Sequence, residues 1–168
     1  MRYFFLALLL VSSPRLLRSE DAPAIKFHQD LQTKDGFSAE LRLTTNKDVF
    51  LEITPNPEHL VPLEEVKRGV PFYTVILFAN AASRNGKPDL VYAIVIKRPD
   101  GSVYGSAKDM PGWKDRPPAT PGLVHIAAGT LKIKIDPEDP AGKYTVIADI
   151  RDNARGTTLH SEQSFVVK

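Results

Sequence analysis

The chain has 168 residues, of which 42% are hydrophobic and 25% charged, with a formal net charge of +2. This balance is typical of a globular domain and excludes a disordered chain and a multi-spanning membrane protein. The near-neutral charge, without a run of Lys and Arg, argues against a nucleic-acid ligand.

Cysteine is absent, which rules out disulfides, thiolate metal ligands and a cysteine nucleophile. The sequence also has no Asn-x-Ser/Thr acceptor for N-glycosylation. For an exported domain of this size, the two absences together favour a bacterial periplasmic or secreted protein.

The first 24 residues are expected to be a removable signal peptide. Arg2 precedes the apolar run YFFLALLLV (Tyr3–Val11), which is too short to cross a bilayer but matches a signal-peptide core. Ala22-Pro23-Ala24 has the form of a cleavage site but lies far from this run, so an uncleaved N-terminal anchor is the alternative. We expect one domain over residues 25–168, without stable membrane insertion after removal of the leader. The sequence does not define an oligomeric state.

Beyond the leader, short strand patterns recur with turn residues between them, and amphipathic helical patterns are scarce. The segment Phe37–Thr44 shows the pattern well, because every second residue from Phe37 is apolar. The further expected strands are Asp48–Thr54, Pro71–Asn80, Leu90–Lys97, Ser102–Ser106, Leu123–Ala127, Thr130–Asp136, Lys143–Ile150 and Ser161–Lys168. A helical turn is expected at Leu63–Val66. Seven to nine strands without a crossover helix predict an all-β, antiparallel sandwich.

The most specific local pattern is IDPEDPAGKYTV, Ile135–Val146. A strand ends at Ile135, an Asp/Pro/Gly corner follows, and Tyr144 begins the next strand after Asp139 and Gly142. In sandwich folds a Tyr at this position turns its hydroxyl back onto the backbone of the corner, an arrangement called the tyrosine corner. We therefore predict structural roles for Asp139, Gly142 and Tyr144.

From Gly69 onward the chain resembles bacterial immunoglobulin-like and macroglobulin-like sandwich domains. VPFYTVILF looks like strand B, LVYAIVIKRPDG like strand C, TLKIKIDP like strand E and GKYTVIADI like strand F. The opening FSAELRLTT and the Trp-Pro loop are similar to those of small exported bacterial proteins. Unlike antibody domains, the chain lacks the Cys pair and a strand-C Trp, whose place Tyr92 or Ile94 would take. The resemblance implies an immunoglobulin-like β-sandwich and brings no catalytic residue with it.

No motif for chemistry stands out. The carboxylates Asp136, Glu138 and Asp139 raise calcium as a minor option, but two prolines interrupt them and the corner already explains them. Serine-nucleophile and phosphate-loop signatures are missing. The four histidines have no ligand-like spacing; they are His28, His59, His125 and His160. We expect no metal, no cofactor and no enzyme activity.

Two strands are apolar on both faces, namely Phe72–Phe78 and Leu90–Ile96. In an antiparallel sheet one face normally meets water, so something should cover their second face. The candidates are the extra N-terminal strands over Phe37–Thr54, the proline-rich loop described next, and a second protein.

The segment DMPGWKDRPPATPG, Asp109–Gly122, contains the single Trp and four of the fourteen prolines. Prolines hold a loop extended at low entropic cost, and Trp113, Met110 and Arg116 are residue types enriched at interfaces. We therefore expect this loop, with Tyr104 nearby, to recognise another cell-envelope protein.

Three alternatives to protein recognition stay open. A carbohydrate-binding module would stack sugar rings on Trp113, Tyr104 and Tyr73. A hydrolase would need acids such as Asp109, Asp115 or Glu65 in one cleft. A hydrolase inhibitor would need an exposed, rigid loop with a protease-fitting side chain at its tip.

Overall fold

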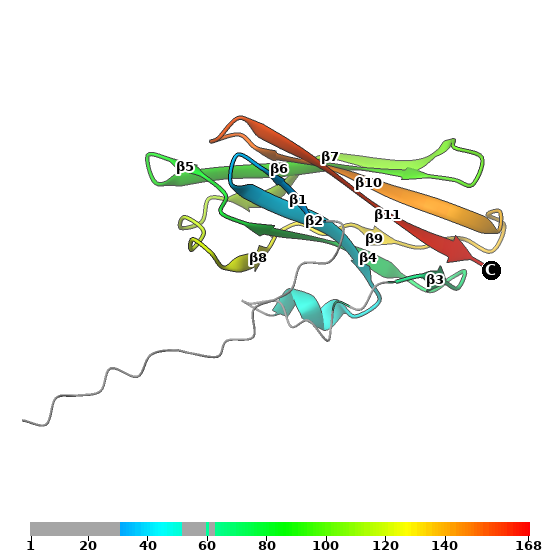
Figure 1. Ribbon diagram of the computed structural model, residues 1–168. Coiled ribbons are helices and arrows are strands. Elements are labelled where there is room, and N and C mark those ends of the chain that lie inside the picture. Colours follow the sequence, from blue (N-terminus) through cyan, green and yellow to red (C-terminus); the bar gives the residue numbers. More distant parts are fainter. Residues whose placement is uncertain (1–30, 52–59, 61–62) are drawn as a thin grey trace, which may run out of the picture.

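The computed structural model describes residues 31–51, 60 and 63–168 (Figure 1). The expected signal peptide, His28 and His59 lie outside the described residues. Within the described residues, no helix is long and apolar enough to span a membrane.

The described chain is folded mainly as strands, joined by short turns. The strands are β1 (Gln32–Lys34), β2 (Phe37–Thr44), β3 (Glu65–Val66), β4 (Phe72–Ala79), β5 (Ser83–Arg84), β6 (Lys87–Lys97), β7 (Val103–Lys114), β8 (Val124–Ile126), β9 (Lys132–Ile133), β10 (Gly142–Asp152) and β11 (Thr157–Val167). One 3₁₀ helix, η1 (Lys47–Leu51), follows β2. Two hairpins turn on Asp35-Gly36 and Asn85-Gly86, whose positive φ angles suit type I′ turns.

The strands form two layers (Figure 1). The first sheet has the order β1-β2-β4-β8, and β9 also pairs with β4. The second has the order β3-β11-β10-β6, with β7 and β5 both paired to β6. Among the described strands, β3 and β11 run parallel, and the other pairs are antiparallel. The predicted all-β immunoglobulin-like sandwich is confirmed, with β4, β6, β9 and β10 in the places of strands B, C, E and F.

The core lies between the two sheets because alternate residues of each strand point inward. In β10 the inward residues Tyr144, Val146, Ala148 and Ile150 are each 0% exposed, and the residues between them are half-buried. One seam closes the sandwich along β2 and β11, where the backbone N–H of Leu41 donates to the Ser161 hydroxyl oxygen at 2.9 Å.

The outer face of the first sheet is also buried. Val75 and Leu77 of β4 pack there with Val49 of η1, Leu60 and Ile126. The N-terminal segment therefore helps to cover the second apolar face of β4. On the neighbouring strand β2, the Glu40 and Arg42 side chains form a buried ion pair on this same face.

The second strand that is apolar on both faces is β6. Its outer face is only partly covered, and half-buried residues lie along it. Val91 is largely covered, whereas Ala93 and Val95 keep partial exposure. Charged side chains flank this face, including Arg151, which pairs across from Val91 and forms an ion pair with Asp109 at 2.6 Å. Long charged side chains of this kind can shield apolar surface with their stems while the charge meets water.

Three local predictions were wrong. The expected strand Asp48–Thr54 is the 3₁₀ helix η1 as far as Leu51, and its last three residues lie outside the described part. Val49 packs onto the outside of the sheet instead of joining its edge. The expected helical turn at Leu63–Val66 contains strand β3, which extends the second sheet through backbone pairing with β11. Residues 109–114, expected in a loop, are the last half of β7.

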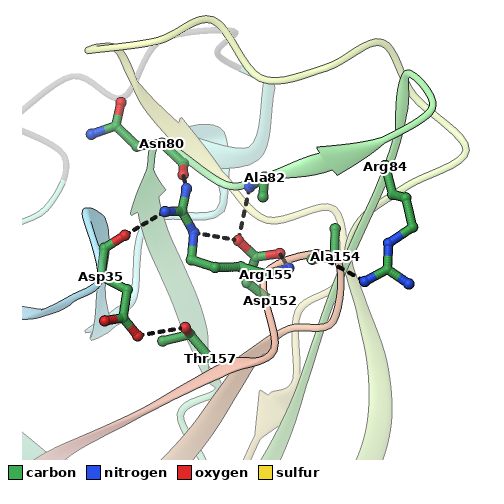
Figure 2. A network of polar contacts seen from close by, with 8 residues as sticks. All are labelled: Asp35, Asn80, Ala82, Arg84, Asp152, Ala154, Arg155 and Thr157. Carbon is green, nitrogen blue, oxygen red and sulfur yellow. Dashed lines mark hydrogen bonds and ion pairs between the residues drawn. The ribbon is translucent and has the colours of Figure 1, made fainter.

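A polar clamp joins both sheets at one end of the sandwich (Figure 2). Asp152 is 0% exposed, and its carboxylate accepts hydrogen bonds from the backbone N–H of Ala82 at 2.8 Å and from Arg155. The Arg155 guanidinium donates in turn to the carbonyl oxygens of Asp35 and Asn80. The clamp thus fixes the β1–β2, β4–β5 and β10–β11 connections to one another.

Candidate functional site

The four predicted contact residues do not form one cluster. Tyr104, Met110 and Trp113 all lie on β7, and Arg116 follows it. Tyr104 and Trp113 are nine residues apart on this strand, a separation of about 30 Å at ~3.3 Å per residue. The structure therefore places them at opposite ends of the sandwich.

Tyr104 ties β7 to the corner that follows β9. Its hydroxyl lies 2.9 Å from the Asp139 carboxylate and 3.0 Å from the Lys134 carbonyl oxygen. Burial and the hydrogen bond to Asp139 raise the pKa of Tyr104 to about 12. A ring held this way contributes to the fold, and its hydroxyl is already occupied.

The corner itself has the geometry of a tyrosine corner. The fully buried Tyr144 donates from its hydroxyl to the Pro140 carbonyl oxygen at 3.0 Å. The Asp139 carboxylate accepts from the backbone N–H of Asp136 at 3.0 Å. Gly142 has a φ of +133°, and a Cβ there would lie 2.8 Å from the Pro99 ring, so the position requires glycine.

Trp113 is half-buried and held on several sides. Its ring packs against Phe78 and His125, with centroids 5.5 and 5.0 Å away. Its indole N–H donates to the Pro117 carbonyl oxygen at 2.8 Å, and the Arg116 guanidinium lies 4.9 Å from the ring centroid. Trp113 therefore anchors the loop that follows it, because both its ring and its polar group have partners within the protein.

Met110 is half-buried against the core, in register with Tyr92 of β6. Of the four predicted residues, only Arg116 is mainly exposed. Tyr104, Met110 and Trp113 thus pack partly into the protein, and Arg116 is the exposed member of the predicted set.

A pocket of about 510 Å³ lies beside the anchored loop. Its walls come from Lys114, Asp115, Arg116 and Pro117 on one side and from the start of β6, Lys87–Asp89, on the other. The pocket combines two prolines with charges of both signs, and Lys114 faces Asp89 at 3.7 Å. The β6 residues were missed because they lie far from the loop in sequence, although the Asn85-Gly86 turn did indicate an exposed hairpin there.

The acids considered for a hydrolase lie apart. Asp109 pairs with Arg151, which is opposite Thr158 near the start of β11. Glu65 pairs with Lys168 at the far end of that strand. Asp115 lies in the loop pocket. Over the described part of the chain, no three His, Asp or Glu side chains are placed to hold a metal ion.

The three aromatic residues considered for sugar stacking, Trp113, Tyr104 and Tyr73, do not lie together either. Tyr73 lies in the first sheet and makes an edge contact with Phe50, at 5.9 Å between ring centroids. Tyr104 and Trp113 lie in the second sheet, at opposite ends of β7. Three rings distributed in this way do not present one stacking surface.

No protein-family model matches the chain, and no curated protein sequence matches it. Among solved structures, it is similar to a Niemann-Pick type C2 protein from Japanese carpenter ant, with 9% identity, 77% of this chain and 89% of that chain covered, and a TM-score of 0.43. A family 123 glycoside hydrolase from Clostridium perfringens matches with 11% identity over 79% of this chain and 27% of that one, at a TM-score of 0.44.

An alkylpurine DNA glycosylase from Pseudomonas fluorescens, solved with DNA containing an abasic-site analogue, matches with 12% identity at a TM-score of 0.36. The match covers 77% of this chain and 30% of that one. The chain thus spans less than a third of the length of either enzyme. At these identities the three structures resemble this chain in fold alone and assign it no activity.

Proposed function

We propose that the protein is a non-enzymatic, exported binding domain that recognises another cell-envelope protein through the loop pocket. The observation that carries the proposal is the pocket of about 510 Å³ between Lys114–Pro117 and Lys87–Asp89, beside a loop that Trp113 anchors from behind. In this proposal the exposed residues of the loop contact the partner, and Trp113 holds them in place.

Rigidity supports this role. The loop residue Ala119 is buried in the core, and Asn80 of the β4–β5 connection accepts a hydrogen bond from the backbone N–H of Gly122 at 2.8 Å. Together with the Trp113 contacts, these attachments fix the loop at both ends. A surface ordered before binding loses little conformational entropy on association, which improves affinity for a given set of contacts.

Site-specific photo-crosslinking in envelope extract of the native host tests this proposal. A benzophenone amino acid replaces the exposed Asp115 in the pocket, and a matched variant carries it at the exposed Asp100, in the turn between β6 and β7. The expected result is one discrete adduct from position 115 that position 100 does not give. No adduct, or the same adducts from both positions, would overturn the proposal.

A further inference from the structure

The loop pocket shares two lining residues with a second pocket. This second pocket, about 300 Å³, is lined by Arg84, Asn85, Lys87, Asp89, Asn153 and Ala154. Lys87 and Asp89 line both pockets. Since these two residues are two apart on β6, they point to the same side of the strand, and the two pockets adjoin along β6. We call this combined surface the basic groove.

Positive charge dominates the basic groove. Its walls carry Arg84, Lys87, Lys114 and Arg116 against the carboxylates of Asp89 and Asp115. The net charge of this groove equals the formal net charge of +2 of the whole chain. Residues 1–24 contribute +1 of that total, so the groove is more positive than residues 25–168 taken together.

Most of these cations have no anionic partner. In the described chain, Arg84 reaches only the Ala154 carbonyl oxygen, at 3.5 Å, and Arg116 lies over the Trp113 ring. Lys87 makes no ion pair with a described residue. Lys114 faces Asp89 at 3.7 Å with both side chains about half-exposed, a pair that solvent and salt weaken strongly. The groove thus presents positive charge that the fold does not neutralise.

Asp89 is engaged within the protein through both of its carboxylate oxygens. One of its carboxylate oxygens accepts from the Asn153 side-chain amide at 3.2 Å. The other is shielded from solvent and lies 3.7 Å from the Lys114 ammonium. Asp89 therefore neutralises Lys114 in part, and recognition by the groove depends on Arg84, Lys87 and Arg116.

We propose that the basic groove binds an extended acidic segment of a partner protein. Carboxylates of the segment pair with Arg84, Lys87 and Arg116. The proposed function, recognition of another protein, selects an acidic segment over a sulfated or phosphorylated polysaccharide, and the experiment below tests the two separately. This inference rests on the proposed function and specifies the chemistry of the partner.

A random dodecapeptide phage library panned against the full chain tests the inference. The expected outcome is enrichment of peptides rich in Asp and Glu, whose retention falls at least tenfold on the Arg84→Gln/Lys87→Gln double variant. Both substitutions lie beside an exposed turn, and retention of the wild-type melting temperature verifies the fold. The matched control, Lys132→Gln/Lys143→Gln, removes two exposed cations outside the groove and should retain the peptides.

Two outcomes of the panning would overturn the inference. One is no enrichment, or enrichment without an acidic bias. The other is equal retention by the double variant and the wild type. Binding of dextran sulfate that depends on Arg84 and Lys87, without peptide enrichment, would identify a polyanion site instead. If position 115 still gives its crosslinked adduct in the R84Q/K87Q variant, the proposed function stands and this acidic-segment inference is rejected.

Discussion

Tyr92 and Tyr144 are both 0% exposed in the same core, yet only Tyr144 has a hydrogen-bond partner for its hydroxyl. The Tyr92 hydroxyl is shielded from solvent and meets no donor or acceptor in the described part of the chain. Burial raises the pKa of Tyr92 well above the ordinary value for a phenol. The phenol therefore stays neutral, but its hydroxyl group adds no hydrogen bond with a described residue to the stability of the core.

This difference predicts opposite results for the same substitution. Tyr144→Phe should lower the free energy of unfolding by about 0.5–1.5 kcal/mol, because it removes a hydrogen bond and leaves the Pro140 carbonyl without that donor. Tyr92→Phe should leave it unchanged or raise it. Urea denaturation of both variants makes the comparison, and a loss of stability in Y92F equal to that in Y144F would contradict it.

The polar clamp should be sensitive to the loss of its buried carboxylate (Figure 2). Asp152→Ala removes the acceptor of the Ala82 N–H and the partner of Arg155, and should cost about 2–4 kcal/mol. The control is Asp149→Ala on the same strand, where the exposed pair with His160 is lost at a cost under about 1 kcal/mol. Equal losses in the two variants would show that the clamp adds no stability beyond that of a surface pair.

Gly129 lies where a side chain has no space. A Cβ there would lie 2.9 Å from the Pro111 carbonyl oxygen and 3.0 Å from the Tyr92 hydroxyl. Gly129→Ala should therefore cost about 1–3 kcal/mol by overpacking. Gly105→Ala on β7 is the matched control, because a Cβ there meets nothing within 4 Å. Thermal unfolding should separate the two variants, and an unchanged melting temperature for G129A would refute this packing.

The fluorescence of the single tryptophan reports on the loop anchor. Arg116→Ala removes the guanidinium over the Trp113 ring, so acrylamide should quench the emission more strongly, at a stability cost of about 1 kcal/mol or less. The control is Arg98→Ala, which uncovers the Tyr104 ring at the same distance of 4.9 Å and should leave tryptophan quenching unchanged. Unchanged quenching in R116A would mean that the arginine does not shield the ring.

The raised pKa of Tyr104 predicts a loss of stability at high pH. The folded protein holds the phenol proton up to about pH 12, whereas the unfolded chain releases it near the ordinary pKa of 10.0. The stabilising contribution is therefore complete below pH 10 and is lost as the pH rises toward 12. Urea denaturation between pH 9 and 11.5 measures this loss, which Tyr104→Phe should reduce. An identical pH dependence in Y104F would contradict the assignment.

The central strands could be predicted because their residues alternate or form continuous apolar runs. β2 has the predicted bounds, and β4, β6 and β10 differ from the predicted strands only at their ends. Strand β1 was missed although Asp35-Gly36 is a strong hairpin signal. Its three exposed residues show no apolar alternation, because they pair at the edge of the sheet without entering the core.

The candidate site was harder to predict than the fold. Proline and glycine at 111–112 indicate a loop, yet β7 continues through them with register shifts against β6, and Asp109 adopts a φ of 50°. These bulges determine which β6 residues face the loop. Sequence patterns do not specify them, so Lys87 and Asp89 could not be assigned to the pocket before the structure.

The seam between Leu41 and Ser161 also has a consequence for folding kinetics. The two residues are 120 positions apart, so the sandwich cannot close along this side until the segment that forms β11 has been synthesised. Strand pairings over such separations must overcome a large loop-closure entropy before their contacts stabilise the chain. Folding should therefore be slow for a domain of this size, in milliseconds to seconds. Until then, residues 40–44 of β2, which extend beyond its pairing with β1, would stay exposed to wrong partners.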